Sequence, residues 1–128
     1  WNRKSQKGVF GMNRDDFEFE VRHVGINCEN EEEADAVAQR FEDVFGFTKK
    51  AGNSSIFAGT GVEVMKTNYL GKNGHIAVAT NDIEKAKAYL AVQGIEFDEE
   101  SAKYKNGKMV AIYLREEFGG FAVHLVQK

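Results

Sequence analysis

The run His-Val-Gly-Ile-Asn-Cys-Glu-Asn at residues 23–30 is matched by His-Ile-Ala-Val-Ala-Thr-Asn-Asp at residues 75–82. Each run opens with a histidine, continues with strand-forming residues and ends in polar residues of the kind that cap a helix. The two runs lie about 50 residues apart, a spacing typical of a repeated supersecondary unit. The sequence therefore predicts two halves of the same design.

A helix is expected directly after each run. The first begins at Asn30 and ends at Gly46, and its apolar residues recur every three or four positions. The second begins at Thr80 or Asn81, carries a shorter apolar stripe and ends at Gly94. Both helices are therefore expected to cover one face of a sheet.

Strand-like segments follow each helix, and the dipeptide Asn106-Gly107 predicts a two-residue hairpin between two of them. The expected strands are 48–51, 54–58 and 62–67 in the first half, and 96–102, 108–114 and 121–127 in the second. The expected fold is α+β, with two βαβββ repeats that form curved mixed sheets around a central cleft. The halves span about 17–70 and 74–128.

Residues 1–16 are rich in charged, glycine and asparagine residues and show no sustained period. We expect a flexible N-terminal linker or tag-derived segment there, and a single domain over 17–128.

Composition excludes several classes of protein. The chain has 128 residues, of which 42% are hydrophobic and 29% charged, so it can build one hydrophobic core. A net charge of −3 argues against nucleic acid as a partner. No apolar run approaches the roughly 18 residues of a membrane span. A single cysteine, Cys28, cannot form an internal disulfide, so we expect a cytoplasmic protein.

Each of the three histidines falls on a predicted strand. Alternation along these strands places His23, His75 and His124 on the face away from the helices, together with Glu63. A lone strand histidine is usually a core or surface residue, but the matched pattern predicts a metal site. Three imidazoles and a carboxylate suit a divalent ion of Zn, Ni, Fe, Co or Mn.

Paired βαβββ units with polar residues on the first and last strands resemble the vicinal-oxygen-chelate superfamily. That superfamily includes glyoxalase I, extradiol dioxygenases and bleomycin- or fosfomycin-resistance proteins. The resemblance implies metal ligands at His23, Glu63, His75 and His124, and many members carry glutamate at the place of His124. It also implies a small ligand that chelates through two neighbouring oxygens.

A closer resemblance rests on the runs 23–30, 52–60, 62–66 and 119–128. They look like a domain appended to some bacterial 2-dehydro-3-deoxyphosphogluconate / 4-hydroxy-2-oxoglutarate aldolases. This resemblance implies an accessory domain, a covalent aldolase domain in the parent chain, and a related oxo acid as ligand.

Three functions are open at this point. The chain is a metal-dependent lyase or isomerase of the glyoxalase type, a metal-binding or ligand-sensing domain without turnover, or a metal-free assembly domain. In the first case, Glu63 would be the catalytic base if it leaves the metal. Halves of this fold pair within or between chains, so a homodimer is also open. Further candidate ligand contacts are Asn27, Ser54, Ser55, Met65, Lys66, Tyr113 and Arg115.

Overall fold

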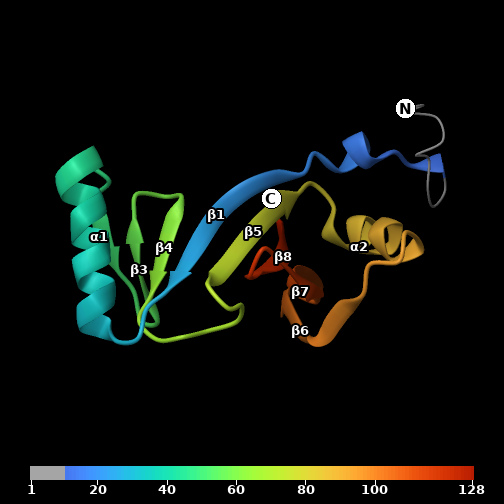
Figure 1. The fold of residues 1–128 in the computed structure, drawn as a ribbon. Helices are drawn as coiled ribbons and strands as arrows, with labels where there is room; N and C mark the ends of the chain where they lie inside the picture. Colours follow the sequence, from blue (N-terminus) through green and yellow to red (C-terminus); the bar gives the residue numbers. More distant parts are fainter. Residues whose placement is uncertain (1–10) are drawn as a thin grey trace. The chain divides into compact units, whose positions relative to one another are not determined.

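A computed structural model describes residues 11–128 and has two α-helices, one 3-10 helix and eight strands in that range (Figure 1). In chain order the elements are the 3-10 helix η3 (Arg14–Phe17), β1 (Glu20–Asn27), α1 (Glu31–Phe45), β2 (Lys49–Ala51), β3 (Ser55–Ala58), β4 (Val62–Met65), β5 (Gly74–Thr80), α2 (Ile83–Val92), β6 (Phe97–Lys105), β7 (Lys108–Phe118) and β8 (Phe121–Gln127). The hydrogen-bonded strand order is β2-β3-β4-β1-β5-β8-β7-β6. This mixed sheet with two helices confirms the predicted α+β class.

The chain divides into two compact units. The α1 unit comprises Arg22–Ala77 and Glu117–Ala122. The α2 unit comprises the described residues up to Val21, together with Val78–Glu116 and Val123–Lys128. These units do not coincide with the predicted halves, because β5 and β8 each contribute residues to both. The predicted domain boundary after residue 16 and the central cleft stay predictions.

Helix α1 begins and ends where the sequence predicts. The Asn30 side chain accepts a 2.8 Å hydrogen bond from the backbone N–H of Glu33, and Gly46 ends the helix in the left-handed conformation at φ 74°. Figure 1 shows α1 lying along β3 and β4. The core between them consists of Cys28, Ala34, Ala38, Ile56 and Val64. Packing against this core fixes which face of β3 and β4 points away from the helix.

Alternation along β4 puts Glu63 on the face opposite the α1 core. Val64 is fully buried in that core, and Glu63 precedes it. Strand β1 runs parallel to β4, with Gly25 opposite Glu63 and Ile26 opposite Val64. The predicted separation of polar and apolar faces is thus confirmed in this unit.

Cys28 is a buried thiol under helix α1. Burial raises its pKa, and the neighbouring Glu33 carboxylate adds to the rise. The thiol is therefore protonated and poorly nucleophilic at neutral pH, as expected for a structural cysteine.

In the α2 unit, the helix begins later than predicted. Asp82, rather than Thr80 or Asn81, caps it by accepting a hydrogen bond from the backbone N–H of Lys85 at 3.1 Å. Thr80 is instead buried, and its hydroxyl donates to the carbonyl of Phe17 at 2.8 Å. The predicted caps were wrong because the side chains of Thr80 and Asn81 are hydrogen-bonded to the carbonyls of Phe17 and Asp16 instead.

The predicted hairpin between β6 and β7 is confirmed. Asn106 and Gly107 have φ values of 54° and 76°, the pair of left-handed residues that a type I′ turn requires. Both strands extend beyond the predicted ranges, with register shifts between Asp98 and Lys103. The Ser101 hydroxyl bridges this irregular stretch, donating to the Asp98 carbonyl and accepting from the backbone N–H of Tyr113.

Residues 14–16 of the predicted linker lie in η3, together with the first residue of the predicted domain, Phe17. Phe17 is 2% exposed and packs against Tyr89, with ring centroids 5.0 Å apart. The backbone N–H of Asn81 donates a hydrogen bond to the carbonyl of Phe17, and its side-chain amide donates to the carbonyl of Asp16. Residues 1–10 of the predicted linker lie outside the described residues.

Among the described residues, no helix combines the length and the apolar character that crossing a bilayer requires. The predicted cytoplasmic location stays a prediction.

Substituting Phe17 tests whether the segment before β1 belongs to the folded core. We expect Phe17→Ala to lower the free energy of unfolding by about 3–5 kcal/mol, because a buried aromatic ring is lost. Phe118→Ala is the matched control, since Phe118 is 48% exposed, and we expect it to change stability by about 0.5 kcal/mol or less. Urea denaturation measures both; equal effects would contradict the packing described.

Candidate metal centre

Three donor atoms converge in the α1 unit. Nε2 of His75 lies 3.0 Å from Oε1 of Glu63, and Nε2 of His23 lies 3.4 Å from the same oxygen. The two Nε2 atoms are 3.3 Å apart. Two imidazoles and one carboxylate therefore point at one small volume, as the sequence predicted for these three residues.

Three strands supply these side chains. His23 lies on β1, Glu63 on β4 and His75 on β5. Gly25 opposes Glu63 in the β1–β4 register and faces the ring of His75. A Cβ built at position 25 would overlap that ring and lie 2.6 Å from its Nε2. Only glycine leaves the space in which the His75 ring sits.

The cluster is shielded from solvent. The His75 side chain is 3% exposed, and those of His23 and Glu63 are 16% and 17% exposed. Hydrogen bonds from His23 and His75, with a further one from Ser55, hold the pKa of Glu63 well below its usual range, although burial alone would raise it. Glu63 is therefore an anion at neutral pH.

Neighbouring side chains fix the cluster. The Ser55 hydroxyl donates to Oε2 of Glu63 at 2.7 Å. The rings of Phe57 and His23 are nearly perpendicular with centroids 5.7 Å apart, and those of Tyr69 and His75 are similarly arranged at 6.5 Å. Asn27, on the same strand as His23, donates to the Tyr69 and Gly71 carbonyls and so ties down the segment before β5. Gly25, Phe57 and Tyr69 were not predicted as site residues.

The fourth predicted ligand, His124, lies on β8 in the α2 unit. Its ring stacks on Tyr113 with centroids 4.4 Å apart and planes 9° from parallel. Val123 and Leu125 on either side belong to the core under α2. His124 therefore projects from the opposite face of its strand, and its participation in a metal site stays a prediction.

The donor geometry in the α1 unit suits a metal ion. Bonds of about 2.0–2.2 Å at tetrahedral or octahedral angles place neighbouring donor atoms roughly 2.8–3.6 Å apart. The three donor–donor distances, 3.0, 3.3 and 3.4 Å, fall in that interval. A neutral imidazole has a single N–H, so the Nε2 of His75 cannot donate to Glu63 and to His23 together, whereas one cation can use all three lone pairs.

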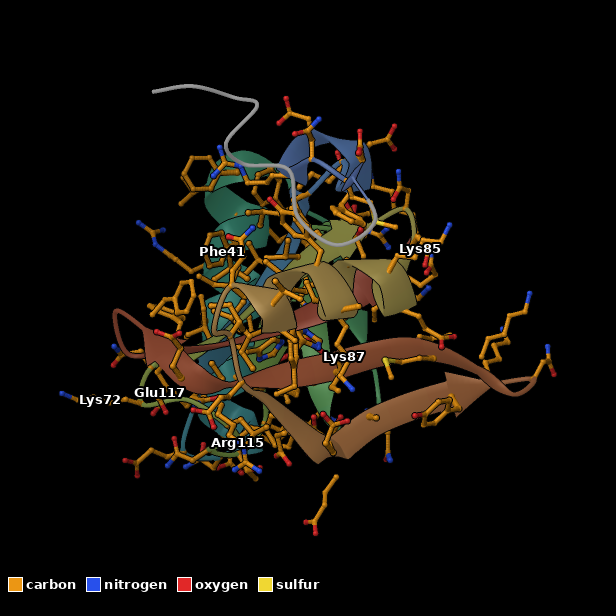
Figure 2. The ribbon with its side chains drawn as sticks, turned by 90° about the vertical axis from the view of Figure 1, so that its right-hand side faces the viewer. Phe41, Lys72, Lys85, Lys87, Arg115 and Glu117 are labelled. Carbon is orange, nitrogen blue, oxygen red and sulfur yellow. The ribbon has the colours of Figure 1, made fainter. Side chains whose placement is uncertain are left out.

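The other residues predicted to contact a ligand have different surroundings. Ser54 is exposed, Met65 is buried in the core, and Lys66 donates to the Gly52 carbonyl at 2.9 Å. Arg115 borders a hollow in the α2 unit that Lys87 also lines. Both side chains are labelled in Figure 2. Three glutamates, Glu84, Glu96 and Glu99, line the same hollow. Its charged side chains are therefore of both signs and do not form a site for an ion of one charge. Donor chemistry, rather than the size of a hollow, identifies the candidate site.

Comparison with known proteins gives structural relatives only. No family model matches the sequence, and no curated protein matches it. A methylmalonyl-CoA epimerase structure shares 18% identity at a TM-score of 0.57 and is similar over 84% of this chain and 93% of its own. The Streptomyces coelicolor epimerase in complex with 2-nitronate-propionyl-CoA shares 17% identity at 0.56, over 85% and 94%. The Mycobacterium tuberculosis epimerase shares 15% identity at 0.52, over 84% and 86%.

Gly25→Ala tests the close approach of β1 to the His75 ring. We expect it to displace the ring and lower the free energy of unfolding by about 1–3 kcal/mol, because the added methyl overfills the site. NMR of the histidine ring protons and urea denaturation measure the two effects. Gly61→Ala is the control, since a Cβ there meets nothing within 4 Å. Unchanged His75 resonances in Gly25→Ala would contradict this packing.

Proposed function

We propose that this chain, which has the vicinal-oxygen-chelate fold, binds one divalent metal ion and uses it to hold a small compound with two neighbouring oxygens. His23, Glu63 and His75 would be the ligands. The observation that carries the proposal is the convergence of Nε2, Nε2 and Oε1 within 3.0–3.4 Å of one another.

We include His124 as a further ligand. The support comes from the repeat, in which His124 occupies the last strand of the second half as Glu63 occupies that of the first. The flat contact with Tyr113 restricts rotation of its ring, as a ligand imidazole requires.

The donor set limits the choice of ion. Imidazole nitrogen with one carboxylate oxygen suits Zn, Ni, Fe, Co and Mn, and two imidazoles with one carboxylate leave coordination positions open. A metal bound there would act as a Lewis acid that stabilises negative charge developing on a chelated oxygen. An oxo acid or a dicarbonyl provides the two oxygens.

The charge state of Glu63 favours the role of a ligand over that of a general base. A base works best with a pKa near the working pH, whereas hydrogen bonds from the two histidines hold the Glu63 pKa far below it in the metal-free chain, and the positive charge of a bound cation in their place would also lower it. As a ligand, its negative charge offsets part of the charge of the cation. Catalysis by Glu63, in a lyase or isomerase of the glyoxalase type, requires that it first leave the metal.

The ligand class divides into two candidates. The aldolase resemblance favours an oxo acid and an accessory role beside a covalent aldolase domain. The epimerase structures, one of which holds methylmalonyl-CoA, add acyl-CoA esters to the compounds worth testing. The oxo acid is the simpler fit, because its neighbouring carboxylate and keto oxygens can bind one ion together.

A metal-free assembly role is the second candidate, and one observation favours it. Three apolar side chains near the end of α1 are largely exposed: Val44 at 50%, Phe45 at 64% and Phe47 at 41%. Grouped exposed apolar side chains often mark an interface.

If a homodimer forms through this surface, Phe45→Ser should lower the sedimentation coefficient, because the dimer dissociates. Sedimentation of the unaltered chain and of Phe45→Ser as the same monomer would remove this alternative.

Metal binding is the first test of the proposed function. After chelator treatment, we expect titration calorimetry to show one Co²⁺ or Zn²⁺ bound per chain. Because loss of an outer-shell partner already costs 10–100-fold in affinity, we expect His23→Ala, Glu63→Gln and His75→Ala each to cost about 100-fold or more. The same reasoning predicts a loss of about 10-fold or more for His124→Gln.

Glu100→Gln, an exposed acid on β6, serves as the control and should bind metal as the unaltered chain does. Failure of the unaltered chain to bind any of these ions, or equal binding by the three ligand variants, would contradict the proposal. A loss in the first three variants without a loss in His124→Gln would restrict the site to the α1 unit.

Turnover is a separate question. We expect the metal-loaded chain to bind pyruvate and 2-oxobutyrate, detected as a change in the Co²⁺ absorption spectrum. Proton exchange into the carbon next to the keto group, followed by NMR in D₂O, would show catalysis. Binding without exchange would assign a sensing or accessory role.

A further inference from the structure

The two carboxylate oxygens of Glu63 have different partners. Oε1 faces the imidazoles of His75 and His23 at 3.0 and 3.4 Å. Oε2 accepts the Ser55 hydroxyl at 2.7 Å. One oxygen is therefore directed at the donor cluster and the other away from it.

The sheet places Ser55 where it can make this bond. Phe57 lies directly opposite Glu63 in the β3–β4 register, so Ser55, two residues earlier on the same face, is its diagonal neighbour. Ile56 between them packs in the core under α1. Ser55 is itself 7% exposed, so water competes poorly for its hydroxyl.

The bond bears on how Glu63 would bind an ion. A carboxylate can coordinate through one oxygen or through both. A short hydrogen bond to Oε2 opposes the rotation that would bring both oxygens to the ion. Coordination through one oxygen uses one position of the ion, and coordination through both uses two.

We propose that Ser55 is a positioning residue that keeps Glu63 bound through Oε1 alone and thereby keeps a metal position that the second oxygen would occupy open for a chelating substrate. This inference rests on the proposed function. It gives the site a preference for two-oxygen compounds over ligands that bind through one atom, and it assigns that preference to a residue outside the metal ligands.

The test compares a chelating and a single-atom probe on the Co²⁺-loaded full chain. Oxalate binds through two oxygens and azide through one nitrogen, and the Co²⁺ absorption spectrum reports both. Removal of an outer-shell hydrogen bond typically costs 10–100-fold, so we expect Ser55→Ala to weaken oxalate binding by about 10-fold and azide binding by less than about 2-fold.

Two further comparisons separate the hydroxyl from packing. Ser55→Thr and Ser55→Val are nearly equal in size, and only the first keeps a hydroxyl, so Thr should retain oxalate binding and Val should lose it. Ser54→Ala is the control, because Ser54 is the exposed neighbour. It should bind both probes as the unaltered chain does.

Three results would overturn the inference. Oxalate binding that is unchanged in Ser55→Ala and Ser55→Val would show that the hydroxyl does not govern chelation. Equal weakening of oxalate and azide would indicate general damage to the site. Absence of Co²⁺ binding by the unaltered chain would refute the proposed function itself, whereas the first two results leave metal binding intact.

Discussion

The imidazole ring of His75 occupies the space where any residue other than glycine at position 25 would place its Cβ. This constraint joins the local structure to the site, because Gly25 also opposes Glu63 across the β1–β4 ladder. His23 lies two residues earlier on the same strand and face, and Asn27 lies two residues later, where it fixes the segment before β5. Alternate residues on one face of β1 thus have three roles: His23 is a donor, Gly25 leaves space for the His75 ring, and Asn27 fixes the segment before β5.

The chemistry of the cluster follows from its burial. A carboxylate that is 17% exposed needs compensating partners, and Glu63 has two imidazoles on one oxygen and a serine hydroxyl on the other. These partners keep it ionised, which suits a metal ligand better than a proton acceptor. The Nε2 atoms of His23 and His75 lie 3.3 Å apart, a separation at which one shared cation, as proposed, would accept both lone pairs.

Much of this could be predicted from the sequence, because it depends on local rules. The repeat of the histidine runs is visible in the sequence itself, and the Asn30 cap and the turn at Asn106-Gly107 follow from nearest neighbours. The structure bears out all three. Alternation also predicted that His23, Glu63 and His75 share a face. The features that escaped prediction depend on contacts between distant segments. Docking of Phe17 on Tyr89 and the bond from Ser55 to Glu63 require the register and packing of separate elements, which no single window of sequence contains.

The most direct test of a shared cation is an anomalous-difference map from crystals of the chelator-treated protein supplied with Co²⁺. The account predicts one strong peak about 2.0–2.2 Å from Nε2 of His23, Nε2 of His75 and Oε1 of Glu63 together. A map without that peak, in which the histidines and the carboxylate contact one another directly while cobalt lies elsewhere, would contradict it.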